Sequence, residues 1–160
     1  MKKIVAGVDE VGRGSLIGPV YAAAVIFKKN IKDKEIIDSK KIKKIKREII
    51  SKDIKKNSIW AIGSASLKEI ENFNILNASL LAMKRAIEKL KIKPNLILID
   101  GNKSPKIKNC LVKTVIKGDQ KIKEISAASI IAKVSRDKLI NKVSKKFKKY
   151  KWDLNAGYGT

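Results

Sequence analysis

Histidine is missing from this sequence altogether, and cysteine, proline and aromatic residues are scarce. The absence of histidine excludes nucleophiles activated by histidine, general acid–base catalysis by histidine and metal ligation by histidine. The single cysteine, Cys110, cannot form an intrachain disulfide, which fits a reducing compartment. Any chemistry must therefore depend on carboxylates, lysine, serine or tyrosine.

Long apolar runs are missing as well. The longest, from Val20 to Phe27, is far shorter than the roughly 20 residues that a membrane-spanning helix needs. A secretory signal is not expected, because Asp9 and Glu10 interrupt the apolar stretch that follows the first lysines. We expect a soluble, cytoplasmic protein with no membrane partner.

Acidic residues are few, with 15 Asp and Glu against 38 Lys and Arg, which gives a net charge of +23. Such a chain attracts polyanions, and nucleic acid is the first candidate. However, 34 of the basic residues are lysine and only four are arginine, and isoleucine is abundant too. A compositional bias explains the excess about as well as a binding surface does. The charge supports a nucleic-acid partner without establishing one.

What is present is enough apolar sequence for a core, since 44% of the 160 residues are hydrophobic. No repeat or linker divides the chain, so one domain over residues 1–160 is expected. Apolar runs and helical periodicity predict an α/β protein with a central mixed five-stranded sheet flanked by helices. We expect strands over 3–8, 19–27, 58–65, 95–99 and 111–116, and helices over 40–57, 74–91 and 124–148.

Four of the scarce acids stand where apolar strands end. Asp9, Glu10 and Asp100 lead directly into glycine-containing sequence, and Asp119 follows a strand after Lys117 and Gly118. Functional sites of open α/β sheets gather outside strand ends, so neighbouring strands would bring these carboxylates together. Oxygen ligands without histidine or cysteine suit Mg²⁺ or Mn²⁺. Two such ions, about 3.5–4 Å apart, can activate water for phosphodiester hydrolysis.

Each acid taken singly also fits a structural role. Asp9 could cap a turn, Asp100 could form an Asx-turn, and Asp119 could be an ordinary loop residue, because aspartate is common in turns. The adjacent acids at 9 and 10 fit this alternative less well. The turn Gly12-Arg13-Gly14 also has two interpretations: a close backbone approach to a ligand with Arg13 on a phosphate, or a tight connection to the next strand.

Taken together, the motifs resemble bacterial ribonuclease HII, a type 2 ribonuclease H, in order and over nearly the whole chain. The matching segments are Asp9-Glu10-Val11-Gly12-Arg13-Gly14, Asp38-Ser39-Lys40-Lys41, Ile99-Asp100-Gly101-Asn102, Lys117-Gly118-Asp119, the helical run from Ser126 to Val134, and Gly157-Tyr158-Gly159-Thr160. Arg13 favours this branch over ribonuclease HIII, which is similar but normally has lysine there. Relatives usually continue beyond the Gly-Tyr motif into helical sequence, so we expect that extension to be lacking.

The resemblance implies a ribonuclease H-like fold and an endonuclease that cuts the RNA strand of RNA/DNA hybrids and 5′ to ribonucleotides embedded in duplex DNA. It implies metal ligation by Asp9, Glu10, Asp100 and Asp119, with two Mg²⁺ or Mn²⁺ ions. It assigns recognition of the ribose 2′-hydroxyl, the group that distinguishes RNA from DNA, to Gly12, Arg13 and Gly14. Tyr158 would pack on the neighbouring deoxyribose.

Several assignments stay open at this point. Lys40 and Lys41 could contact backbone phosphates, and for Lys133 and Arg136 on the last helix a packing or surface role fits at least as well as a contact with the substrate. A monomer is expected. The alternative function is a catalytically weak or inactive basic nucleic-acid-binding domain of the same fold, and a DNA-cutting relative is a further possibility.

Overall fold

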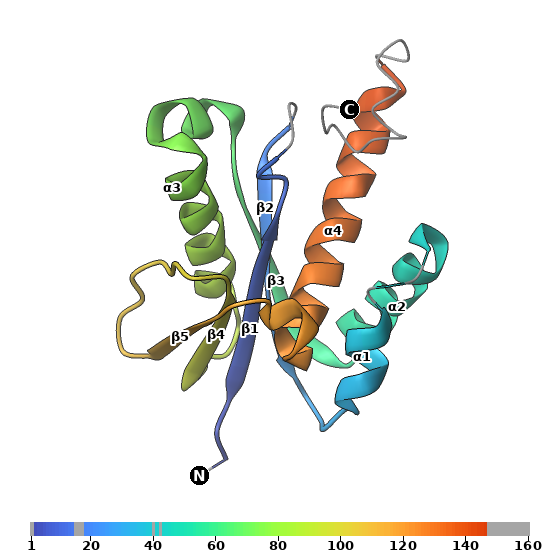
Figure 1. Ribbon diagram of the computed structural model, residues 1–160, viewed down its shortest axis with the longest axis vertical. Helices are drawn as coiled ribbons and strands as arrows, with labels where there is room; N and C mark the ends of the chain where they lie inside the picture. The colour runs from blue at the N-terminus through green and yellow to red at the C-terminus, as the bar shows by residue number, and fades with distance from the viewer. Residues whose placement is uncertain (1, 15–17, 40, 42, 147–160) are drawn as a thin grey trace.

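A five-stranded mixed sheet forms the centre of the computed structural model, which describes residues 2–14, 18–39, 41 and 43–146 (Figure 1). Its strands stand in the order β3-β2-β1-β4-β5, which confirms the predicted architecture. The strands are β1 (Val5–Val11), β2 (Val20–Phe27), β3 (Ser58–Ala65), β4 (Leu96–Asp100) and β5 (Leu111–Val115). The helices are α1 (Asp33–Ser39), α2 (Lys44–Lys56), α3 (Leu67–Glu88), the 3-10 helix η1 (Gly118–Gln120) and α4 (Lys123–Ser144).

Strand direction brings the ends of three strands to one edge of the sheet. β1 pairs antiparallel with β2, and β2 antiparallel with β3, whereas β1, β4 and β5 run parallel to one another. In the register, Val8 lies beside Ile99 and Asp100 lies beside Val115. The carboxyl ends of β1 and β4 therefore finish side by side, where the predicted acidic residues are found.

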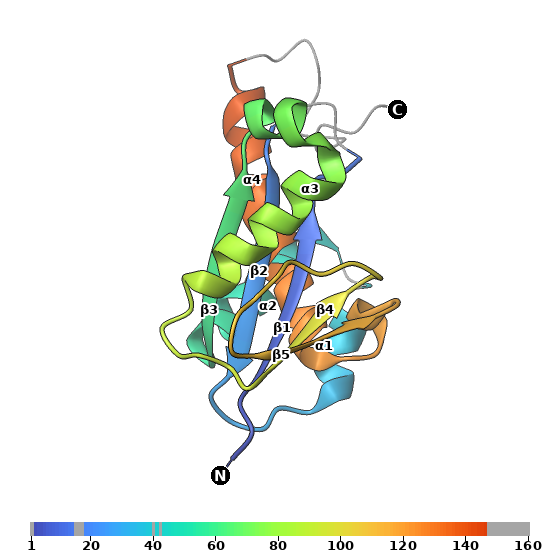
Figure 2. The same cartoon turned by 90° about the vertical axis from the view of Figure 1, so that its left-hand side faces the viewer.

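Helices cover both faces of the sheet. Figures 1 and 2 show α3 on one face and α1, α2 and α4 on the other. Because successive strand residues point to opposite faces, Ala22 and Ala24 belong to the core under α3, whereas Ala23 and Val25 belong to the core under α4. These small residues bring helix and sheet close together. Two buried glycines allow the closest approaches: Gly7 against the backbone of Glu124 and Gly63 against the backbone of α3.

The element boundaries differ from the predicted ones by a few residues at most ends, and three of the differences change how the elements are understood. The helix expected over 40–57 is α2 alone, which begins at Lys44, and the separate helix α1 precedes it. β1 extends to Val11, so Asp9 and Glu10 lie within the strand rather than after it. The helix expected from Asn74 begins earlier, at Leu67.

The N-cap predicted at Asn74 is nevertheless present inside α3. Asn74 has φ 68° and ψ 169°, which breaks the helix into two segments. Its side-chain oxygen accepts a hydrogen bond of 2.9 Å from the backbone N–H of Asn77, as an N-cap does. A second cap, the reciprocal pair Ser66 and Glu69, starts the first segment. α3 is thus two capped helices in succession.

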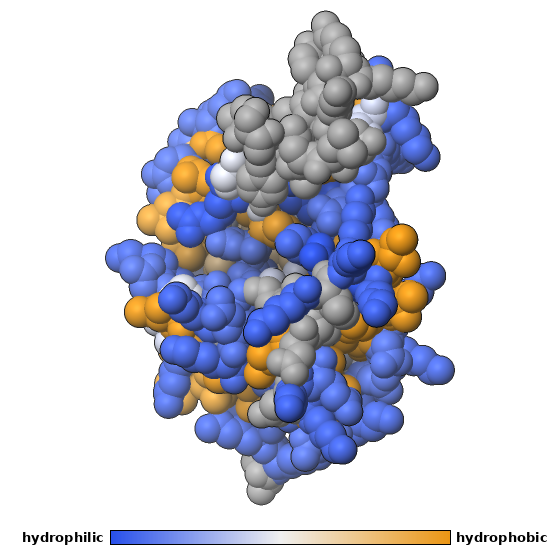
Figure 3. All heavy atoms as spheres, turned by 45° about the vertical axis from the view of Figure 1, so that its right-hand side comes forward, coloured by the Kyte–Doolittle hydropathy of each residue, from blue (hydrophilic) through white to orange (hydrophobic). Residues whose placement is uncertain are grey.

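Polar side chains cover much of the surface. Figure 3 shows hydrophilic residues over most of one face, with smaller apolar patches between them. Among the helices that the structure describes, none has the length and apolar character to cross a membrane.

Candidate active site

Asp9 and Asp100 occupy neighbouring positions on the same face of the sheet. Val8 pairs with Ile99 in the parallel strands β1 and β4, and the two acids are the next residue of each strand. Val8 and Ile99 belong to the core under α3, so alternation directs the next residue of each strand toward α4. The two carboxylates therefore approach each other on the α4 side, and Asp9 is only 4% exposed.

The environment of Asp9 disfavours its charge. Burial, followed by the negative charges of Asp100 and Glu10, raises the pKa of Asp9 well above its usual range. Two hydrogen bonds oppose this effect: the backbone N–H of Glu10 donates to Oδ1 of Asp9 at 2.8 Å, and the Ser129 side chain forms the other. Ser129 stands on α4 between the buried residues Ala128 and Ile130. A buried carboxylate beside further acids is an environment that a bound cation would stabilise.

Glu10 is directed differently from its neighbour. Strand alternation starts its side chain on the α3 side of β1, and its carboxylate lies 3.6 Å from the guanidinium of Arg13. Burial is the main cause that raises the pKa of Glu10; Arg13 lowers it, and the charge of Asp100 raises it. The charge of Asp100 thus acts on Glu10, while the carboxylate of Glu10 is paired with Arg13, the central residue of the Gly-Arg-Gly turn.

Asp119 reaches the same edge through η1. Lys117 adopts a left-handed conformation with φ 55°, which turns the chain after β5 into this short helix. The backbone N–H of Asp119 then donates to Oδ1 of Asp100 at 3.2 Å. Gly118 packs closely on α4: a Cβ there would lie 2.6 Å from Cδ1 of Ile125 and would have to displace the end of that side chain. The packing of η1 on α4 therefore sets Asp119 beside Asp100.

The four predicted acids lie near the carboxyl ends of β1 and β4, and each of the other three interacts with Asp100. The charge of Asp100 acts on Asp9 and Glu10, and its side chain accepts a hydrogen bond from the backbone N–H of Asp119. Within the described ranges, no three His, Cys, Asp or Glu side chains form a group that could hold a metal ion together. The direction of Glu10 away from Asp9 accounts for part of this. The donor chemistry still fits a hard divalent cation, because the four side chains offer only carboxylate oxygens and two of them have raised pKa values.

The turn after β1 is backed by a residue that sequence reasoning left as packing or surface. Gly12 adopts φ 101°, a conformation that favours glycine. Arg136 of α4 lies beneath it with 1% exposure, and its Nε donates to the carbonyl oxygen of Pro19 at 3.2 Å. Packing is thus the correct half of that expectation. Arg13 is half-exposed at the surface of the turn.

The remaining predicted residues divide into exposed ones and ones outside the described ranges. Gly14, Lys41 and Lys133 are exposed. Lys40 and Tyr158 lie outside the described residues. The sequence signal that could have identified Ser129 and Arg136 is the same for both: each is a polar residue of the last predicted helix and stands four residues from an apolar residue that the structure buries.

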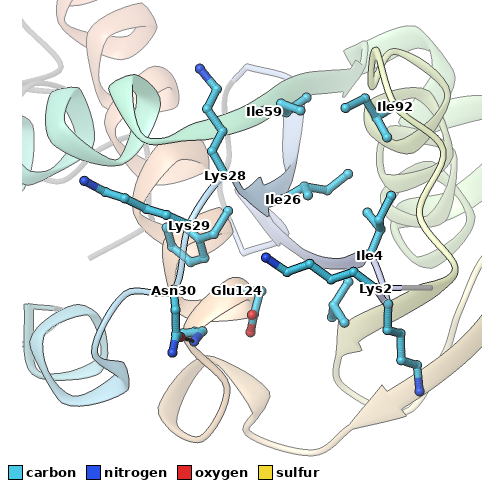
Figure 4. A pocket seen from close by; sticks show the side chains of 13 residues that line it. Lys2, Ile4, Ile26, Lys28, Lys29, Asn30, Ile59, Ile92 and Glu124 are labelled. Atoms are coloured by element: carbon cyan, nitrogen blue, oxygen red, sulfur yellow. Dashed lines mark hydrogen bonds between the residues drawn. The ribbon is translucent and has the colours of Figure 1, made fainter.

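A hollow of about 730 Å³ lies at the opposite end of the sheet. Figure 4 shows isoleucine side chains around it and lysine side chains at its rim, where β1 begins and β2 ends. Lys123 at this end is bound to Asn30, with Nζ 2.8 Å from Oδ1. None of the predicted site residues lines this hollow. The acidic site lies instead at the carboxyl ends of β1 and β4.

Comparisons with known proteins agree with the fold and the motifs. The family model for ribonuclease HII matches residues 6–160. Ribonuclease HII of Pelagibacter ubique is 72% identical over 158 residues, which cover 99% of this chain and 85% of that protein. Ribonuclease HII of Borreliella burgdorferi is 52% identical over 158 residues, which cover 98% of this chain and 87% of that protein.

Solved structures are similar over nearly the same length. The ribonuclease H2 from Pyrococcus horikoshii OT3 superposes with a TM-score of 0.83 at 32% identity, covering 98% of this chain and 81% of that one. The ribonuclease HII of Archaeoglobus fulgidus, solved in complex with PCNA, gives a TM-score of 0.74 at 25% identity, covering 98% and 82%. The chain therefore belongs to the ribonuclease HII family, metal-dependent endoribonucleases that act on RNA/DNA hybrids.

Proposed function

We propose that this ribonuclease HII cuts the phosphodiester on the 5′ side of a ribonucleotide in a duplex, using two divalent ions held by Asp9, Glu10, Asp100 and Asp119. The products would carry 3′-hydroxyl and 5′-phosphate ends. One observation carries the proposal: Asp9 is 4% exposed, and burial, followed by the negative charge of Asp100 on the neighbouring strand, raises its pKa. Carboxylates kept in such a position need positive charge nearby to stay ionised.

The four acids would share the work of holding the ions. Asp9 and Asp100 face α4 from adjacent strands, and Asp119 is tied to Asp100 by its backbone N–H. Glu10 would become the fourth ligand if its carboxylate moved away from Arg13, whose guanidinium is half-exposed. When bound, Mg²⁺ or Mn²⁺ activates water for attack and offsets negative charge on the phosphate. Ser129 would hold the Asp9 carboxylate in one orientation, as partners of ligating residues do.

The Gly12-Arg13-Gly14 turn would read the sugar next to the cleaved bond. Glycine permits close backbone approach to a ribose, and Arg13 is within 3.6 Å of Glu10, which links the turn to the acids. The 2′-hydroxyl is the group that separates RNA from DNA at this point. Tyr158 on the adjoining deoxyribose, and Lys40 and Lys41 on phosphates, complete the proposed contacts. We infer a monomer that acts in the cytoplasm.

The decisive experiment is cleavage of a duplex that carries a single ribonucleotide, with Mg²⁺ or Mn²⁺ and with a chelator. We expect cutting only with metal, and Asp100→Asn should reduce it to background while circular dichroism stays unchanged. Asp53→Asn is the matched control, because it makes the same chemical change at an exposed acid of α2. Full activity of Asp100→Asn would refute the assigned site.

The same assay separates the competing functions. Binding of the duplex without cleavage in either metal would favour the non-catalytic nucleic-acid-binding domain. Cleavage of an all-DNA duplex would contradict a requirement for the 2′-hydroxyl.

A further inference from the structure

A buried guanidinium lies under the turn that approaches the substrate. Arg136 belongs to α4, more than a hundred residues along the chain from Gly12, and it is 1% exposed. Burying a charged side chain costs free energy unless it is well hydrogen-bonded. An apolar residue would fill the same space without that cost, so the guanidinium itself requires an explanation.

The contacts of Arg136 lie at both ends of the segment that joins β1 to β2. A Cβ at Gly12 would overlap Nε of Arg136 and lie 3.0 Å from its Cδ and 3.2 Å from its Cζ. A Cβ at Gly18 would lie 3.6 Å from its Nη2. At the residue after Gly18, Nε donates a hydrogen bond of 3.2 Å to the carbonyl oxygen of Pro19.

Two features make this arrangement specific for arginine. The guanidinium is planar and presents its donors in a fixed fork, whereas the ammonium of lysine is compact and strongly hydrated. Its Nε, Cδ and Cζ lie where a side chain of residue 12 would stand, and Gly12 has φ 101° and no side chain, so the arginine side chain lies close against the turn backbone. A lysine would keep the charge but would not present a fixed fork of donors beside Gly12 and Pro19.

We propose that Arg136 is a positioning residue that holds the Gly12–Gly14 turn in the conformation that reads the 2′-hydroxyl. It acts through the turn and has no contact with the substrate. This inference rests on the proposed role of the turn. It assigns to α4 a second task beside the Asp9–Ser129 contact: the same helix supports the acids through Ser129 and the sugar-reading turn through Arg136.

The test measures kcat/KM on the single-ribonucleotide duplex for Arg136→Lys and Arg136→Gln. Glutamine keeps a donor for Pro19 and removes the buried charge, so it provides a second folded variant. We expect each to lower kcat/KM by about 10- to 100-fold, the loss that a displaced contact of about 1 Å produces. With a chelator present, both should also lose the preference of wild type for the ribonucleotide duplex over the all-DNA duplex in binding.

A double-mutant cycle distinguishes positioning from general destabilisation. If Arg136 acts through the turn, Arg136→Lys should add little to the loss already caused by Arg13→Ala. Arg85→Lys is the matched control, because Arg85 also donates to a backbone carbonyl, Ser64, at 2.8 Å, but belongs to α3 on the other face. We expect it to leave kcat/KM and the ribonucleotide preference unchanged.

The outcomes separate this inference from the proposed function. A wild-type protein that fails to cut the duplex would refute the proposed function itself. Wild-type cutting together with unchanged kcat/KM and preference in both Arg136 variants would overturn the inference alone. It would also be overturned if both variants failed to fold, or if their loss multiplied fully with that of Arg13→Ala.

Discussion

The charge of Asp9 at the active site lowers the stability of the folded protein. Its carboxylate is almost fully buried, and its pKa is raised by burial and by the charges of Asp100 and Glu10. A raised pKa means that the folded protein disfavours the charged form, so an ionised Asp9 at neutral pH lowers the free energy of unfolding. Without a bound cation, the side chain that the reaction needs therefore destabilises the protein.

We expect Asp9→Asn to be more stable than wild type in the presence of a chelator at neutral pH. Asparagine removes the charge and keeps an oxygen for the N–H of Glu10. Each kcal/mol gained should raise Tm by about 2–4 °C in a domain of this size, while cleavage with metal is lost. Asp53→Asn, at an exposed position, should leave Tm almost unchanged. A fall in the Tm of Asp9→Asn would contradict the electrostatic argument.

Residue by residue, the sequence indicates the acids better than it indicates their partners. Asp9 and Asp100 are identified because each ends an apolar run of the sequence, and the parallel pairing of β1 with β4 then brings them together. The hydrogen bond from Ser129 and the support from Arg136 depend on how α4 packs across the sheet. That packing is a tertiary property, and the local spacing of residues in the sequence does not predict it.

Among the elements, β3 and α3 show where local sequence signals predict the structure and where they are incomplete. Strand β3 agrees fully with its predicted range, because polar and turn residues stand at both ends of its alternating apolar pattern. Asn74 is correctly predicted as an N-cap, yet the segment before it is helical too, because Ser66 and Glu69 form their own capping box. A helix that restarts at a left-handed asparagine lacks a continuous apolar stripe.

Glu69 joins the start of α3 to its later turns and should make stability depend on pH. Its carboxylate accepts from both Nη1 and Nη2 of Arg85, at 2.8 and 2.7 Å. These bonds are the main cause that lowers the pKa of Glu69 to about 2 from 4.5. A carboxyl with a lowered pKa contributes stability that is present above the unfolded value, about 4.5, and is lost as pH falls through about 2.

We therefore expect Glu69→Gln to have a lower Tm than wild type at pH 7, with the gap closing between about pH 4.5 and pH 2. Glutamine can keep the capping bond, so the gap reports the charge. Glu88→Gln provides the control, because the pair of Glu88 with Lys84 is exposed and 4.0 Å long and should contribute little. A gap that persists unchanged at pH 2 would show that the Arg85 pair does not cause it.

The contact between α3 and the sheet depends on one glycine of β3. A Cβ at Gly63 would overlap backbone atoms of Ala82 and Ala86 and lie 2.9 Å from Cβ of Arg85. Backbone cannot move aside as a flexible side chain can, so α3 would have to shift away from the strand. Only the core under α3 would lose packing, because the core under α4 lies on the other face of the sheet.

Gly63→Ala should accordingly lower the free energy of unfolding by about 1–3 kcal/mol or more, as overpacking of a core does. Urea denaturation measures this directly. Ser64→Ala, at the exposed neighbouring position, should change it by no more than about 0.5 kcal/mol. Equal stability of the two variants would show that α3 yields without cost.

For the whole molecule, the central question is how much of the +23 charge takes part in binding. At physiological salt the Debye length is about 8 Å, so only lysines close to the duplex interact with its phosphates. The acids and the Gly-Arg-Gly turn lie at one end of β1, whereas Lys2 lies by the hollow at the opposite end. Distance from the acidic site should therefore separate binding lysines from those that reflect composition.

The salt dependence of duplex binding tests this separation. For Asp100→Asn with a chelator, log affinity should fall linearly with log salt, at a slope of about −0.9 per phosphate contact. If Lys41 contacts a phosphate, Lys41→Gln should reduce the slope by about one contact, whereas Lys2→Gln should leave it unchanged. Fluorescence anisotropy over a range of salt concentrations gives both slopes. Equal reductions in the two variants would mean that the duplex is attracted by charge spread over the whole surface, and the compositional excess of lysine would then be part of the binding surface.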